Sequence, residues 1–184
     1  IYDYHLGRDM RKTQIKGYVE TGWGTNIANA LQIRVHARGQ YTLHVAPDTT
    51  REGKGTAGRG AALLLHNPCL VATPGEGLLH ACAKGKAVAA LHSVRGVKTI
   101  IVVLHLPSGG KESETVEYLT AVTATLQAEI SHRLTDHPGV WQDAALVVMG
   151  DMNYIDATID TATGSGLHPS PLARAAMETM ARTL

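Results

Sequence analysis

An apolar run that ends in Gly-Asp-Met-Asn, at residues 144–153, constrains this chain more than any other stretch. Its first half consists of strand-forming side chains, and its second half offers a carboxylate and a carboxamide. Because side chains alternate along an extended chain, Asp151 and Asn153 should emerge on one face and Met152 on the other. We therefore predict a buried strand with two polar side chains at its C-terminal end. The simpler interpretation is a turn after a strand, since Gly, Asp and Asn are all favoured in turns.

The composition is that of a globular chain with a real core. Of 184 residues, 44% are hydrophobic and 18% are charged, and the net charge of +1 does not by itself demand nucleic acid. The longest apolar run, residues 99–106, is too short to span a bilayer. The sequence does not open with the pattern of a signal peptide, in which basic residues precede an apolar run. We therefore expect an intracellular location, with the nucleus as one alternative. The two cysteines, Cys69 and Cys82, suit either two buried thiols in a reducing compartment or a single bridge.

Periodicity predicts short strands in blocks, interrupted by helices. Strands are expected at residues 15–19, 40–46, 61–65, 77–82, 86–93, 97–106 and 144–153, and helices at residues 27–35, 113–134 and 171–184. The run 97–106 is continuous and β-branched, so it should be buried on both faces. Blocks of strands of this kind suit a layered α+β sandwich better than a strictly alternating βαβ fold.

Three further features carry candidate chemistry. Glu20 directly follows a predicted strand and precedes Thr21 and Gly22, as a metal ligand at a sheet edge would, although an exposed Glu at a turn has the same pattern. His105 lies near the end of the strand 97–106, where a core histidine would also fit. The Gly-rich loop 47–60 carries three basic side chains that could follow a phosphate backbone or simply belong to a connector. These are Arg51, Lys54 and Arg59.

Taken in order, these short sequence motifs resemble those of the endonuclease/exonuclease/phosphatase superfamily, which includes deoxyribonuclease I. The resemblance is carried by Glu20-Thr21 after a strand, by His105-Leu106-Pro107 at a strand end and by Gly150-Asp151-Met152-Asn153 at another strand end. It covers most of the chain, from about residue 15 to residue 184. The tail, with Ile159-Asp160 followed by a loop and an Ala-rich helix, looks like that of LINE-type retrotransposon endonucleases, although Thr161 stands where Arg is usual.

The resemblance implies a four-layer αββα sandwich of α+β class with the site at the rims of the sheets. It also implies a Mg²⁺-dependent phosphodiesterase, with Mn²⁺ as an alternative ion, in which water attacks phosphorus. Glu20 would be the metal carboxylate, and His105 would bind the phosphate or assist the leaving group. Asp151 would orient or deprotonate the water, and Asn153 would hold a phosphate oxygen. Residues 51–59 would contribute Arg51, Lys54 and Arg59 to substrate binding.

Two further motifs of the family have no counterpart in the sequence. No strand-borne Asn precedes Glu20, and no Asp-His pair follows Asn153. The chain also opens without Met, so we expect residues 1–184 to be one incomplete domain that lacks its first strand and its last catalytic segment. Three functions remain open: an endonuclease that acts on DNA, a phosphoesterase that acts on phosphoinositides or sphingomyelin, and an inactive truncated copy. The sequence does not identify protein partners.

Overall fold

The strands form two sheets that pack face to face in this computed structural model, which describes residues 14–49, 60–82, 85–106, 112–152 and 170–184. The first sheet is antiparallel and has the order β1-β3-β2, with β1 (Ile15–Val19), β3 (Ala61–His66) and β2 (Tyr41–Ala46). The second has the order β4-β6-β7-β8, with β5 paired to β6 as well. Its strands are β4 (Leu70–Val71), β5 (Gly77–Ala81), β6 (Ala87–Val94), β7 (Val97–His105) and β8 (Ala145–Asp151).

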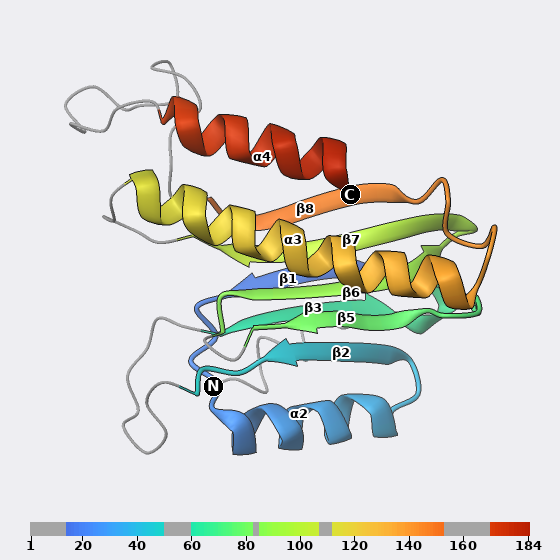
Figure 1. Cartoon of the computed structure of the whole chain (residues 1–184). Coiled ribbons are helices and arrows are strands. Elements are labelled where there is room, and N and C mark those ends of the chain that lie inside the picture. The colour runs from blue at the N-terminus through green and yellow to red at the C-terminus, as the bar shows by residue number, and fades with distance from the viewer. Residues whose placement is uncertain (1–13, 50–59, 83–84, 107–111, 153–169) are drawn as a thin grey trace.

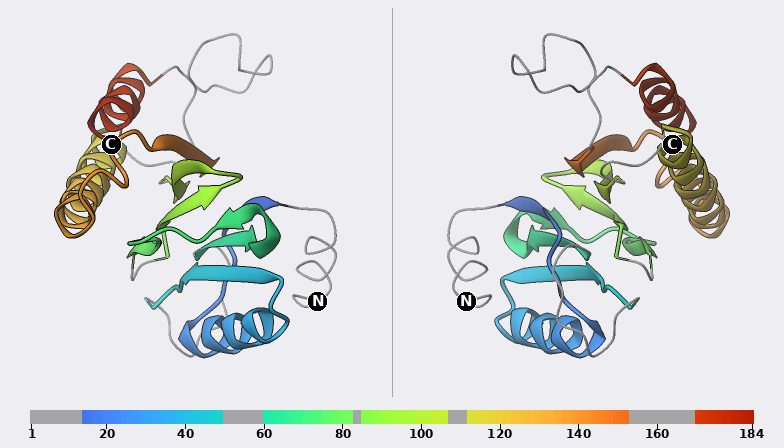
Figure 2. Two further views of the ribbon diagram at one scale, coloured as in Figure 1. Left: turned by 90° about the vertical axis from the view of Figure 1, so that its right-hand side faces the viewer. Right: turned by 90° about the vertical axis from the view of Figure 1, so that its left-hand side faces the viewer.

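Helices cover the outer face of each sheet (Figures 1 and 2). Helix α2 (Thr25–Ala37) packs on the three-stranded sheet through Ala28, Leu31 and Val35. Helices α3 (Glu112–Asp136) and α4 (Pro171–Thr183) lie over the five-stranded sheet. Buried aliphatic side chains from both sheets fill the space between the sheets. The layers are therefore α, β, β and α, which confirms the predicted α+β sandwich.

Strand β7 is the centre of the second sheet, as its β-branched run predicted. It pairs antiparallel with β6 and parallel with β8, so both of its edges are hydrogen-bonded. Every residue from Thr99 to Leu106 is buried. Its even-numbered side chains from Ile100 to Leu106 face the α3 layer, and Ile101 and Val103 face the other sheet. This alternation fixes the side on which His105 lies.

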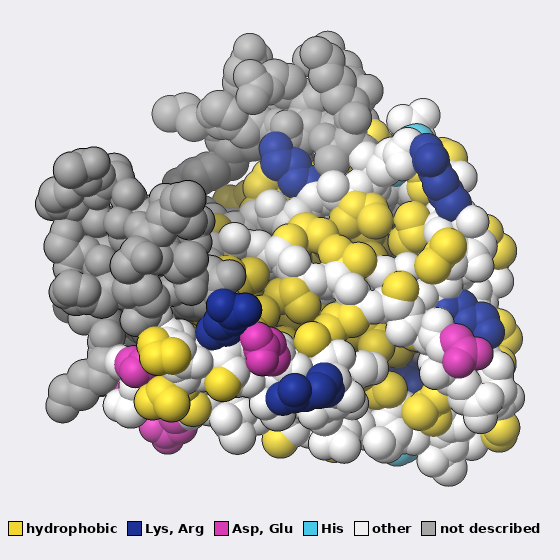
Figure 3. All heavy atoms as spheres, turned by 90° about the horizontal axis from the view of Figure 1, so that it is seen from above, with side chains coloured by type: hydrophobic (Ala, Val, Ile, Leu, Met, Phe, Trp, Pro, Cys, Tyr) yellow, Lys and Arg dark blue, Asp and Glu magenta, His cyan; other side chains and the backbone are white. Residues whose placement is uncertain are grey.

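Strand β8 differs from the buried strand that the sequence predicted. It is the end strand of its sheet among the described strands, and it is only partly buried. Val147 of β8 and Leu172 of α4 are 38% and 58% exposed. Figure 3 shows hydrophobic side chains gathered on this face of the molecule. The prediction was wrong because a run of apolar residues does not reveal whether a second strand pairs with its outer edge.

Helix α3 begins at Glu112, one residue before the predicted start, and the Glu112 side chain contacts the start of α4. The Glu112 Oε1 atom accepts hydrogen bonds from Ser170 Oγ at 2.7 Å and from the Leu172 backbone N–H at 2.9 Å. The carboxylate thus satisfies the first turn of α4, where a negative charge is stabilised. The Ser170 hydrogen bond also lowers the pKa of Glu112.

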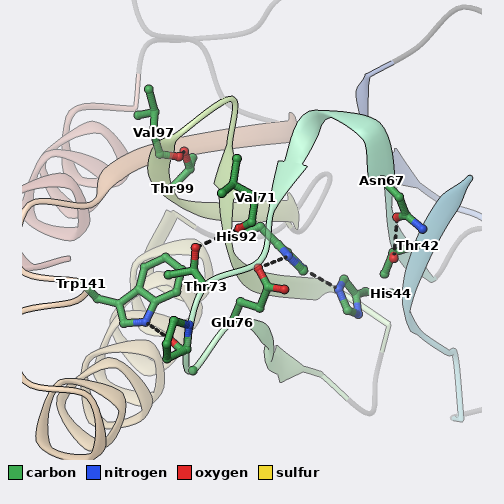
Figure 4. A network of polar contacts seen from close by, with 12 residues as sticks. Thr42, His44, Asn67, Val71, Thr73, Glu76, His92, Val97, Thr99 and Trp141 are labelled. Carbon is green, nitrogen blue, oxygen red and sulfur yellow. Dashed lines mark hydrogen bonds and ion pairs between the residues drawn. The ribbon is translucent and has the colours of Figure 1, made fainter.

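A polar network inside the sandwich joins the two sheets away from the rim (Figure 4). The Nε2 atoms of His44 on β2 and His92 on β6 are 3.0 Å apart. The second ring nitrogen of His92 lies 3.6 Å from the Glu76 carboxylate. Burial lowers the pKa of His44 to about 4, and the pKa of His92 is also lowered by burial. Both imidazoles are therefore neutral at neutral pH and share one hydrogen bond.

Neither Cys69 nor Cys82 is in a disulfide, as expected for the two-thiol alternative. No helix in the described part of the chain combines the length and the apolar character that crossing a membrane requires.

Candidate active site at the rim of the two sheets

The ends of β7 and β8 place two candidate residues side by side. The parallel pairing aligns His105 with Asp151, and the Leu106 N–H donates to the Asp151 carbonyl oxygen at 2.9 Å. Met149 belongs to the cluster between the sheets and Met152 packs on the α3 side. Strand alternation therefore puts the Asp151 side chain on the inner side, the same side as His105. The predicted separation of Asp151 from Met152 agrees with this packing.

Gly150 allows this close pairing. Its φ of 136° lies in the region that favours glycine, and a Cβ atom at this position would collide with the carbonyl oxygen of Leu104 on β7. A side chain here would push β8 away from β7 just before Asp151. The glycine of the Gly-Asp-Met-Asn motif thus has a packing role that is independent of any ligand.

Glu20 reaches the rim from the other sheet, through an unusual backbone conformation. It follows β1 directly and has a φ of 54°, which is uncommon for a residue with a side chain. The next residue holds the bend, because the Thr21 N–H donates to the Gly60 carbonyl oxygen at 3.2 Å. Gly60 lies so close to Thr21 that a Cβ atom on it would strike the Thr21 hydroxyl. The cost of such a conformation, about 1–3 kcal/mol, is typical of functional sites.

Glu20 and His105 meet across the gap between the sheets. The Glu20 Oε1 atom lies 3.5 Å from His105 Nε2, and their side chains are 56% and 9% exposed. The carboxylate is thus open to solvent, and the imidazole is held beneath it. Among the described residues, neither ring nitrogen of His105 has a hydrogen-bond partner. Buried polar atoms are rarely left without a partner, so the His105 imidazole is a candidate to bind a further group at this rim.

The structure therefore brings together three of the residues that the sequence singled out, namely Glu20, His105 and Asp151. They come from three strands of two sheets and lie at one rim. Asn153, Arg51, Lys54 and Arg59 lie outside the described residues, so their predicted roles stay predictions.

Asp48 is a rim residue that the sequence analysis assigned only to a loop. It follows β2 by two residues, and its side chain is only 8% exposed. Its backbone N–H donates to the Trp23 carbonyl oxygen at 3.1 Å, which ties it to the segment after Glu20. The available signal was its position, since Glu20, Asp48 and Asp151 are all carboxylates at strand ends. The loop interpretation gave Asp48 no separate weight, because Pro47 and Asp48 are ordinary turn residues.

The donor set at this rim suits a hard cation. Glu20 and Asp151 both offer exposed carboxylates. Mg²⁺ prefers oxygen ligands, binds through one or two carboxylates and keeps several waters. In the part of the chain that the structure describes, no group of three or more His, Cys, Asp or Glu side chains is placed to hold a metal ion. A site with few protein ligands, as Mg²⁺ uses, is compatible with this arrangement of the described residues.

Comparison with known proteins gives matches in structure and none in sequence. No protein-family model and no curated protein matches the chain. The catalytic domain of human Nocturnin, solved with a bound sulfate anion, is 18% identical with a TM-score of 0.50, over 83% of this chain and 56% of that one. A humanized TDP2 from D. rerio is 16% identical with a TM-score of 0.49, over 91% of this chain and 59% of that one.

A D. rerio TDP2 complexed with a single-strand DNA product is 14% identical with a TM-score of 0.47, over 85% of this chain and 54% of that one. The chain thus spans less than two thirds of the length of each of these three structures. The likeness to Nocturnin shows that the chain shares the fold of that catalytic domain.

Proposed function

We propose that this chain carries the core of a metal-dependent phosphodiesterase that hydrolyses phosphodiester bonds, with DNA as the substrate of an endonuclease. The observation that carries the proposal is the meeting of Glu20, His105 and Asp151 at one rim, although β1, β7 and β8 are far apart in the sequence. Two carboxylates and a buried imidazole are the groups that phosphoryl transfer needs for charge stabilisation and proton transfer. The superfamily fold supports the same reaction class.

Each residue has a distinct role in this proposal. Asp151 takes a proton from the attacking water as the oxygen–phosphorus bond forms. His105 donates a hydrogen bond to a phosphate oxygen or a proton to the leaving oxygen as its bond to phosphorus breaks. A positioned acid or base of this kind contributes typically ~10²–10⁴-fold to the rate. Asn153, by family resemblance, holds a phosphate oxygen through its amide.

Glu20 would hold Mg²⁺ or Mn²⁺. When bound, the ion supplies charge stabilisation for the phosphoryl oxygens. The left-handed backbone of Glu20, held by the Thr21–Gly60 hydrogen bond, keeps the carboxylate on the His105 side of the gap. The 3.5 Å contact with His105 then restricts where the carboxylate can lie.

The first prediction tests the reaction on supercoiled plasmid DNA. We expect Mg²⁺-dependent nicking that falls at least ~10²-fold in Asp151→Asn, because the proton acceptor is lost. Asp143→Asn is the matched control, since Asp143 is an exposed aspartate outside the rim and should leave nicking unchanged. Agarose electrophoresis of nicked and closed circles measures the rate. Equal nicking by Asp151→Asn and the parent chain would reject the assigned role.

The same preparation distinguishes the substrate alternatives. Plasmid, sphingomyelin vesicles and an inositol polyphosphate are offered in parallel. Nicked circles, released phosphocholine and released inorganic phosphate are quantified, respectively. The proposal expects turnover of plasmid alone, falling steeply as salt rises because basic side chains follow the DNA backbone. Turnover of a lipid or inositol substrate instead would assign the chain to the other branch. A protein that is folded, binds the metal and turns over none of the three would identify an inactive copy.

A further inference from the structure

A hollow lies away from the candidate site, between α3 and residues at the end of β5 and just before β6. Its volume is about 390 Å³, within the range of small-molecule pockets, roughly 300–1,000 Å³. Tyr118 and Val122 of α3 line one wall, and Cys82 and Lys86 line the other. It is separate from the rim, because α3 covers the outer face of the sheet, whereas Glu20 and Asp151 lie on the inner side.

Two polar groups of this hollow lack a hydrogen-bond or ion-pair partner among the described residues. The Tyr118 hydroxyl oxygen is buried and has no hydrogen-bond partner among the described residues. Burial raises the pKa of Tyr118, so the group is a proton donor at all ordinary pH values. The Lys86 ammonium lies over the Tyr118 ring, 5.6 Å from its centroid, and no carboxylate of the described residues pairs with it.

The rest of the lining is mixed: His80 and Thr125 are polar, and Ala121 and Val122 are aliphatic. Ala121 and Val122 present aliphatic groups on the same face of α3 as Tyr118. A buried donor without an acceptor costs free energy, and an unpaired ammonium beside it attracts a negative charge. The chemistry that satisfies all of these groups together is an anionic head with acceptor oxygens, attached to an apolar body.

We propose that this hollow binds a small organic anion, a carboxylate or a phosphate monoester with an aromatic or branched apolar body. The anionic head contacts the Lys86 ammonium and accepts a hydrogen bond from the Tyr118 hydroxyl, and the body packs on Ala121 and Val122. The proposal does not rest on the phosphodiesterase activity. It concerns a site that touches the rim only through the backbone, since the His105 N–H donates to the Lys86 carbonyl oxygen at 2.8 Å.

The test uses benzoate, with neutral benzamide as its matched control, and phenylphosphonate as a phosphate-like probe that cannot be hydrolysed. We expect benzoate or phenylphosphonate to bind with Kd on the order of 1 mM, and benzamide to bind at least about tenfold more weakly, because it lacks the charge. Titration by NMR of the full chain locates the shifts. The probe that binds more tightly, benzoate or phenylphosphonate, identifies the preferred head group as a carboxylate or a phosphate.

Variants separate binding from structure. Lys86→Met keeps the aliphatic stem and removes the charge, and Tyr118→Phe removes only the hydroxyl, so each should weaken the preferred anion by about tenfold. Lys98→Met, which changes a lysine near the start of β7, is the control and should bind like the parent chain. Tyr118→Phe should also unfold no more readily than the parent chain, because the hydroxyl that it removes has no partner. That result keeps a loss of binding distinct from a loss of folding.

Cysteine labelling gives an independent readout. Cys82 lines the hollow and Cys69 does not. The bound anion should slow alkylation of Cys82 by iodoacetamide and leave the rate at Cys69 unchanged, as measured by peptide mass spectrometry. The proposal is overturned if neither anion binds, if benzamide binds as tightly as benzoate, or if both variants bind like the parent chain. Protection of both cysteines alike would also overturn it, because it would reflect a global effect.

Discussion

At the scale of single residues, the rim depends on backbone positions as much as on carboxylates and imidazoles. Glu20 has a left-handed backbone, and Gly60 must lack a side chain because Thr21 lies against it. Gly150 must lack one because Leu104 lies against it. A sequence shows that glycines and acidic residues occur at strand ends, but not which of them is in close contact with another strand.

Gly150→Ala should therefore destabilise the protein strongly. The added Cβ meets the Leu104 carbonyl oxygen in addition to an unfavourable φ, so we expect a loss of roughly 3–5 kcal/mol in the free energy of unfolding. Gly139→Ala is the control: its φ of 76° is also positive, but a Cβ there meets nothing within 4 Å. That variant should lose only about 1–2 kcal/mol. Urea unfolding followed by circular dichroism measures both, and equal losses would show that the contact with Leu104 has no cost.

At the scale of elements, the two sheets are joined by different contacts at different places. The rim has the pair Glu20–His105, and the interior has His44–His92 with Glu76 beside them (Figure 4). The interior pair is neutral because burial disfavours the charged imidazole. It should make the association of the sheets sensitive to acid.

The pH dependence of unfolding follows from His44. Its pKa falls from 6.5 in the unfolded chain to about 4 in the folded protein, with burial first and then His92 and His36 as causes. The unfolded chain therefore takes up a proton as pH falls below about 6.5, while the folded state stays neutral until about pH 4. We expect stability to be full above pH 6.5 and to fall by about 2–3 kcal/mol between pH 6.5 and 4.

Unfolding by urea at several pH values checks this expectation. His44→Gln should flatten the pH dependence in that window. His132→Gln should leave it unchanged, because the side chain of His132 is 74% exposed on α3. A parent chain whose stability is constant from pH 6.5 to 4 would contradict the buried neutral pair.

Strand β8 makes a different prediction, because its outer edge has no strand beside it in the described part of the chain. Open edges with apolar side chains favour pairing between molecules. Val147→Lys should reduce self-association at high protein concentration, as measured by sedimentation velocity. Val97→Lys is the control, since Val97 is 56% exposed at the start of β7 and away from that edge. If both variants associate like the parent chain, the β8 edge is not responsible.

At the scale of the whole molecule, much of the fold was readable from the sequence. The β-branched run of β7 and the apolar stripe of α3 identified the centre of one sheet and its covering helix. The order Glu20, His105, Asp151 carried the resemblance that predicted the four-layer sandwich. The arrangement within the molecule was not readable, because it depends on contacts between distant segments. Examples are the carboxylate of Glu112 at the start of α4, the buried Asp48 and the end position of β8.

The central claim is that Glu20, His105 and Asp151 lie together at one rim, where the Glu20 carboxylate would bind a divalent cation close to the other two residues. Mn²⁺ added to ¹⁵N-labelled protein tests this claim directly, because the paramagnetic ion broadens nearby amide resonances whether or not the chain is active. We predict that the amides around all three residues broaden together. Glu20→Gln should weaken the effect at every one of them, and Glu129→Gln on the exposed face of α3 should not. Broadening at only one of the three segments, or an unchanged effect in Glu20→Gln, would contradict the account.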